Sequence, residues 1–188
     1  NGTLGWYDEA EIKNYDYIKI TGTPEIWVAG VGLHSDEYLK QGETAATSAA
    51  PADNYAYYKD GKLTLQNFSY TGNGHEYAQN TYAGIYTTID TLTLELKGSN
   101  ALDVQSETVN PFGIFVTNNL VISGSGSLNI KADDVGIRAD QKDMTISGVT
   151  LDITAGKAGI YAHDNCTVSG GANLTIKADS DGIRSYSK

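Results

Sequence analysis

The stretch KADDVGIRAD, residues 131–140, returns as KADSDGIRSY at residues 177–186, and this repetition decides the fold. Its Gly-Ile pair occurs five times, with the glycine at positions 84, 113, 136, 159 and 182, so the successive steps are 29, 23, 23 and 23 residues. A leucine recurs on the same period at positions 128, 151 and 174. Two independent marks that share a period of 23 residues indicate a repeat architecture.

Each repeat contains short stretches of alternating apolar and polar residues, such as SLNI and TLDI, joined by Gly and Ser. One such unit cannot bury its apolar face alone, whereas copies stacked about 4.8 Å apart form parallel sheets around a shared core. The composition of 21 Gly and 13 Tyr with one Met agrees with strands rather than helices. No six-residue period, typical of left-handed β-helices, is visible. We therefore predict an all-β protein, a right-handed parallel β-helix of about five rungs.

The repeats are expected to fill residues 61–188. We align one earlier rung with the repeat by matching Leu96, Leu102 and Val104 to Ile122, Leu128 and Ile130. The longer step of 29 residues is then an insertion around SETVNPF. An earlier rung is expected to begin at KLTLQNFSY and to carry a long loop, TGNGHEYAQNTY. The repeated strands LVIS, MTIS and CTVS also align Cys166, the single cysteine, with Leu120 and Met144, so we interpret it as a small core side chain.

The first sixty residues do not repeat, and we interpret residues 1–60 as an N-terminal β-rich cap on the exposed end of the solenoid. A separate sugar-binding domain is the alternative. At the other end the sequence stops just after the fifth Gly-Ile pair with no cap. Because unpaired strand edges recruit further strands, we expect either a trimmed longer protein or end-to-end self-association through the C-terminal rung.

The formal net charge of −10 argues against nucleic acid and anionic membranes as partners, since both are bound through clustered Lys and Arg. No apolar run approaches the roughly 18 residues that span a bilayer, so direct membrane insertion is not expected. Cations and neutral or weakly charged ligands remain.

In each Gly-Ile-X unit the isoleucine should point inward and residue X outward. The X residues then form one row along the solenoid: Tyr86, Phe115, Arg138, Tyr161 and Arg184. Aromatic rings and guanidinium planes at rung spacing suit stacking on the apolar faces of sugar rings, and we predict that this row contacts glycan. The alternative is that the row satisfies itself by cation–π stacking between neighbouring rungs.

A second outward row contains Thr88, Thr117, Asp140, His163 and Tyr186. His163 beside Asp164, with Asp140 one rung away, suggests acid–base chemistry, although a lone exposed histidine is usually a surface residue. Asp133 and Asp179 lie two rungs apart, about 9.6 Å at the ~4.8 Å rung spacing, which is near the wide end of the roughly 6.5–9.5 Å separation of inverting glycosidases. Lys157, in the rung between, would neutralise them.

The rungs KADDVGIRAD, ISGVTLDITAGKAGIYAH and SGGANLTIKADSDGIRS resemble those of a family of bacterial surface carbohydrate-binding β-helix proteins. EIWVAGVGLHS and DGKLTLQNFSYTG are similar to the opening of repeat-bearing surface proteins of Gram-positive gut anaerobes. The resemblance implies a non-catalytic protein that binds plant-type polysaccharide and holds calcium at its acidic turns. The metal ligands it implies in this chain are Asp133, Asp134, Asp179 and Asp181.

These observations favour a non-catalytic extracellular or cell-surface module that binds polysaccharide or a host or plant glycan, assisted by calcium and no other cofactor. A structural stalk or protein-adhesion segment is the first alternative, and a polysaccharide lyase or glycoside hydrolase is the second. Enzymatic activity stays open. Binding is favoured because the acidic and basic elements recur with the repeat, whereas active sites are usually singular.

Overall fold

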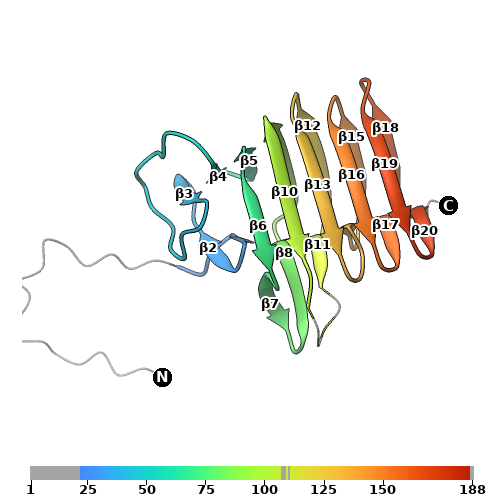
Figure 1. The fold of residues 1–188 in the computed structure, drawn as a ribbon, viewed down its shortest axis with the longest axis horizontal. Helices are drawn as coiled ribbons and strands as arrows, with labels where there is room; N and C mark the ends of the chain where they lie inside the picture. Colours follow the sequence, from blue (N-terminus) through green and yellow to red (C-terminus); the bar gives the residue numbers. More distant parts are fainter. Residues whose placement is uncertain (1–21, 107–108, 110, 187–188) are drawn as a thin grey trace, which may run out of the picture.

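The computed structural model describes residues 22–106, 109 and 111–186, which form strands and no helix (Figure 1). Sheet 1 contains β1 (Ile26–Val28), β2 (Val31–Leu33), β7 (His75–Ala78), β8 (Thr81–Thr87), β11 (Phe112–Val116), β14 (Ile137–Ala139), β17 (Ala158–Ala162) and β20 (Asp181–Ser185). Sheet 2 contains β3 (Glu37–Lys40), β4 (Tyr55–Lys59), β5 (Lys62–Gln66), β9 (Thr91–Lys97), β12 (Asn119–Gly124), β15 (Met144–Ser147) and β18 (Cys166–Ser169). Sheet 3 contains β6 (Ser69–Gly72), β10 (Ser99–Val104), β13 (Ser127–Ala132), β16 (Thr150–Ala155) and β19 (Asn173–Ala178).

From β5 onward the chain visits sheets 2, 3 and 1 in turn, and every strand except β7 stacks parallel to the strand of the same sheet in the neighbouring rung. In the described part of the chain each sheet holds five such strands, so about four complete turns lead from β5 to β18. Figure 1 shows the resulting row of rungs, from the green first rung to the red last one. The prediction of an all-β protein built as a parallel β-helix is confirmed.

The Gly-Ile pairs are explained by close approach of two sheets. The isoleucines of the first four pairs are completely buried in the core, at positions 85, 114, 137 and 160. A Cβ atom added at Gly84 or Gly159 would lie 2.8 or 2.7 Å from the carbonyl oxygen of the next Gly-Ile glycine, and it would also meet an apolar side chain of sheet 3. Only glycine leaves room for both neighbours, so the repeat keeps glycine at this corner.

The segment before the first rung extends two of the three sheets. β1 pairs antiparallel with β8, and β4 pairs antiparallel with β5 and β3. Leu33, Leu39 and Tyr58 belong to the same core cluster as the rungs, so the core is continuous from this segment into the solenoid. Residues 1–21 of the predicted cap lie outside the described residues.

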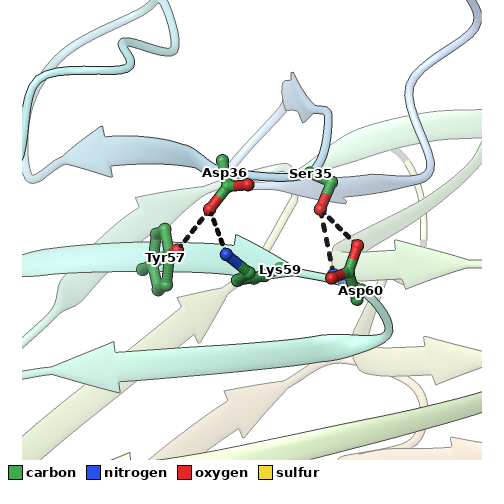
Figure 2. Close-up of polar contacts among 5 residues, drawn as sticks. All are labelled: Ser35, Asp36, Tyr57, Lys59 and Asp60. Atoms are coloured by element: carbon green, nitrogen blue, oxygen red, sulfur yellow. Dashed lines mark hydrogen bonds and ion pairs between the residues drawn. The ribbon is translucent and has the colours of Figure 1, made fainter.

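A polar network ties the β2–β3 turn to β4 and the turn that follows it (Figure 2). Asp36 accepts hydrogen bonds from the Tyr57 hydroxyl at 2.8 Å and from Lys59 Nζ at 2.9 Å. Ser35 Oγ donates to Asp60 at 2.7 Å and accepts from the Asp60 backbone N–H at 3.1 Å. The hydrogen bonds from Lys59 and Tyr57 lower the pKa of the Asp36 carboxyl, so the network is formed by the charged carboxylate at neutral pH.

The predicted alignment of the second rung is wrong by two residues. Leu94, rather than Leu96, pairs with Ile122, and Leu102 pairs with Ile130 rather than with Leu128. The inward position opposite Leu128 is taken by Asn100, which is 3% exposed. Because a shift of two residues leaves every side chain on its original face, apolar alternation does not distinguish the two registers.

Asn100 tolerates burial because both polar atoms of its side-chain amide form hydrogen bonds. Its Oδ1 accepts from the Phe68 backbone N–H at 2.8 Å, and its Nδ2 donates to the carbonyls of Lys97 and Ser127 at 3.2 and 3.1 Å. The side chain therefore links β10 to the residue just before β6, to the end of β9 and to the start of β13.

We expect Asn100→Ala to lower the free energy of unfolding by about 1–3 kcal/mol, because the Phe68 N–H would lose its buried acceptor. Urea denaturation measures this change. Asn129→Ala is the matched control, since Asn129 is exposed on β13, and we expect it to stay within about 0.5 kcal/mol of the parent. Equal losses in both variants would contradict the role assigned to Asn100.

The predicted long loop of residues 71–82 is wrong in part, because it contains a strand. β7 turns back antiparallel onto the start of β8, with His75 opposite Ala83 and Ala78 opposite Thr81. The predicted alignment of Cys166 is confirmed, because Cys166 pairs with Met144, which in turn pairs with Leu120. Cys166 packs half-buried against the core, and burial raises the pKa of its thiol.

The last rung has no further strand against it within the described residues. Val168 on β18 and Ile183 on β20 are 42% and 46% exposed, although the residues that pair with them in the preceding rung are completely buried. End-to-end association through this rung stays a prediction.

Candidate functional site

The five predicted contact residues lie side by side on the outer face of sheet 1. Tyr86 pairs with Phe115, Phe115 with Arg138, Arg138 with Tyr161, and Tyr161 with Arg184. We call these five residues the outer row. Trp27 extends the row by one strand, because β1 places it directly opposite Tyr86. Trp27 was not predicted as part of the row because β1 lies outside the repeat and runs antiparallel to it.

The first part of the outer row is covered by β7. Tyr77 stacks on Tyr86 with ring centroids 4.5 Å apart and lies 4.8 Å from the ring of Phe115. His75 stacks on Trp27 at 4.5 Å. Burial between β7 and the outer row raises the pKa values of Tyr77 and Tyr86 and lowers that of His75. Phe115 is 9% exposed, so here the row is packed against the protein's own rings.

Phe112 also belongs to this cluster and was missed from the sequence. Its ring meets Phe115 edge-on at 5.3 Å, and the Arg138 guanidinium lies 5.6 Å from its centroid. Strict alternation would place Phe112 on the inward face with Ile114, two positions further on, so the sequence pattern gave no signal that its ring lies with Phe115.

The second part of the outer row is open. We call Arg138, Tyr161, Arg184 and Tyr186 the open segment. The guanidinium carbon of Arg138 lies 4.7 Å above the Tyr161 ring, and Tyr161 meets Tyr186 edge-on at 5.8 Å. Tyr186 is 50% exposed, and the side chain of Arg184, which stacks on it at 4.8 Å, is 48% exposed. Tyr186 comes from the second outward row, which therefore joins the first at this end.

The acidic turns are engaged mainly with protein groups. Asp134 accepts from Lys157 Nζ at 3.0 Å, Asp133 accepts from the Ser106 backbone N–H at 2.7 Å, and an Asp181 oxygen lies 3.6 Å from Arg184. Asp179 is exposed and lines a shallow groove with Asp133, Lys131 and Lys177. In the part of the chain that the structure describes, no three Asp, Glu, His or Cys side chains gather into a metal-binding group. The arrangement does not resemble a calcium cage, which needs six to eight oxygen ligands, and calcium stays a prediction.

The side chains considered for acid–base chemistry bind different neighbours and do not form one site. His163 Nδ1 is 3.0 Å from Asp164, and both side chains are about half exposed. Asp140 follows Ala139, which pairs with Ala162 just before His163, so it lies one rung from His163 as predicted, and its carboxylate accepts a hydrogen bond from Arg138. Lys157 pairs with Asp134, and the lysines in the groove with Asp133 and Asp179 are Lys131 and Lys177. Asp164, Asp140 and Asp134 thus each pair with a different side chain: His163, Arg138 and Lys157.

Fold and surface together define a β-solenoid that presents a partly open row of aromatic and guanidinium groups along one sheet. The chain belongs to the family of carbohydrate-binding domain-containing proteins, whose model matches residues 91–188, just over half of the 188 residues. The match covers the rungs from β9 to β20. No curated protein and no solved structure matches the sequence. Membership of this family supports the predictions of a carbohydrate-binding β-helix and of a glycan partner.

Among the described residues, no helix has the length and apolarity needed to cross a membrane.

Proposed function

We propose that the open segment of the outer row binds polysaccharide by stacking sugar rings on Tyr161, Tyr186 and Arg138. One observation carries the proposal: in a member of a carbohydrate-binding family, flat side chains on successive rungs leave part of their surface accessible. The C–H face of a sugar ring is apolar and suits an aromatic ring, while its hydroxyl groups stay in water. A ladder with a rung spacing of about 4.8 Å offers repeated contacts, which favours a polymer.

The proposed module is non-catalytic and acts outside the cell or at its surface, where polysaccharides are met. Two observations support binding without turnover. The acidic turns are directed to Lys157, Ser106 and Arg184, and the open segment repeats the same groups on successive rungs. Stacking on Tyr161 and Tyr186 needs no metal ion, so the proposal gives calcium no part in the contact.

The experiment is retention of the purified chain by a panel of immobilised neutral and acidic polysaccharides, with calcium and with a chelator. We expect saturable retention on at least one polymer, unchanged by the chelator. Each retained polymer is then assayed for new reducing ends and for unsaturated products. Retention without product supports the proposal. Absence of retention on every polymer would contradict it, and released product would replace it with an enzymatic function.

A further inference from the structure

The cations of the open segment are already neutralised by the protein. Arg138 donates from Nε and Nη2 to the same oxygen of Asp140, at 2.8 and 2.5 Å. The two side chains are only 29% and 27% exposed, so water screens this pair less than a fully exposed one. Because Asp140 lies two positions after Arg138, both stand on the same outer face of sheet 1.

The second guanidinium also lies beside a carboxylate, although this contact is longer and both side chains are nearly half exposed. Arg184 lies 3.6 Å from an Asp181 oxygen and donates a hydrogen bond to the hydroxyl of Tyr186. At the adjacent turn Lys157 is paired with Asp134. Arg138, Arg184 and Lys157 therefore each have a carboxylate partner, and the whole chain carries a net charge of −10.

An anionic sugar that stacked on Tyr161 would meet a carboxylate at Asp140 and a guanidinium that Asp140 already occupies. It would lose hydration without gaining an unpaired cation, and like charges brought together at an interface oppose binding. An uncharged sugar meets neither obstacle, because it uses only the ring faces and the remaining guanidinium donors.

We propose that Asp140 makes the open segment selective for uncharged glycans, by holding Arg138 in an internal ion pair and by repelling carboxylate and sulfate groups. This inference rests on the proposed function, and it adds the charge class of the ligand and the residue that sets it. Such repulsion is a common way for a binding surface to reject a competitor.

The test compares two forms of one polymer. Every polysaccharide retained in the panel is paired with a derivative that differs in charge, which is the carboxymethyl ether of a neutral polymer or the carboxyl-reduced form of a uronate polymer. We expect the parent protein to bind the uncharged form at least about tenfold more tightly, equivalent to about 1.4 kcal/mol. We also expect its affinity for that form to change less than about twofold between low and high salt.

Asp140→Asn removes the negative charge that neutralises the Arg138 guanidinium, with little change in side-chain shape. We expect affinity for the charged form to rise at least about fivefold and to fall again at high salt, because the new attraction is electrostatic. Affinity for the uncharged form should stay within about twofold. Asp181→Asn, which frees Arg184, gives a second test should Asp140→Asn lower the melting temperature.

Asp164→Asn is the matched control, because it makes the same change of charge at a carboxylate that pairs with His163 instead of an arginine of the row. We expect it to leave the preference unchanged. Preference of the parent for the charged form, or equal gains in Asp140→Asn and Asp164→Asn, would overturn this inference and leave the proposed function standing. Absence of binding to both forms would overturn both proposals.

Discussion

Gly136→Ala is expected to lower the free energy of unfolding by at least about 3 kcal/mol. The added Cβ would lie 2.6 Å from the carbonyl oxygen of Gly159 and would also collide with the Cγ2 methyl of Ile153. The first neighbour is backbone held in a parallel sheet and the second is a fully buried side chain, so neither can move without disturbing a rung. For a chain of this size, about 3 kcal/mol corresponds to a fall in melting temperature of roughly 6–12 °C.

Gly182→Ala is the matched control because the same Gly-Ile motif stands there on the last described rung. No heavy atom lies within 4 Å of the Cβ position at Gly182. We expect this variant to melt within about 2 °C of the parent, as for an ordinary surface substitution. Thermal unfolding followed by circular dichroism compares the two. Similar losses in both variants would show that glycine is needed for backbone conformation rather than for close approach of the sheets.

Tyr161→Ala is expected to weaken polysaccharide binding at least about 30-fold, the effect of removing a central aromatic contact worth about 2 kcal/mol. Tyr161 stands in the middle of the open segment, between Arg138 and Arg184 in the pairing register, and it contacts Tyr186. Its removal takes away the stacking surface and also the ring on which the Arg138 guanidinium rests. Isothermal titration with the polymer retained in the panel measures the change.

Two further variants separate a lost contact from a damaged fold. Tyr161→Phe keeps the ring and should bind within about threefold of the parent, because the proposed contact is stacking. Tyr55→Ala removes a half-buried tyrosine from β4, on another sheet, and should leave the affinity unchanged. If Tyr161→Ala keeps full affinity, the open segment is not the binding surface. If Tyr55→Ala loses affinity equally, the effect does not arise at the open segment.

The parallel β-helix could be predicted because the sequence repeat directly reflects the stacking of its rungs. A period of 23 residues between Gly136, Gly159 and Gly182 requires equal turns, and equal turns place residues one period apart in register. The order of the outer row follows from the same rule. Such a row can be predicted without knowing any long-range contact, because the period and the direction of one side chain are sufficient.

The second rung shows where this reasoning stops. Leucines and valines at every other position allow both the predicted register and the observed one, which differ by two residues. The choice is made by Asn100, whose amide satisfies the Phe68 N–H and two carbonyl groups. Because Phe68 and Ser127 are 32 and 27 residues away from Asn100 in the sequence, no local pattern predicts that an asparagine will occupy a leucine position.

The sequence by itself determined the stacked rungs, the recurrence of the Gly-Ile pair and the existence of a row containing Phe115, Arg138 and Tyr161, since each depends only on period and alternation. The tertiary structure alone decided which part of that row is open. β7 folds Tyr77 over Tyr86 and Phe115, and Asp140 takes the Arg138 guanidinium. β7 lies outside the repeat, and the ion pair depends on side-chain directions. The exposure of the outer row and the charge around it therefore depend on contacts that the 23-residue period does not predict.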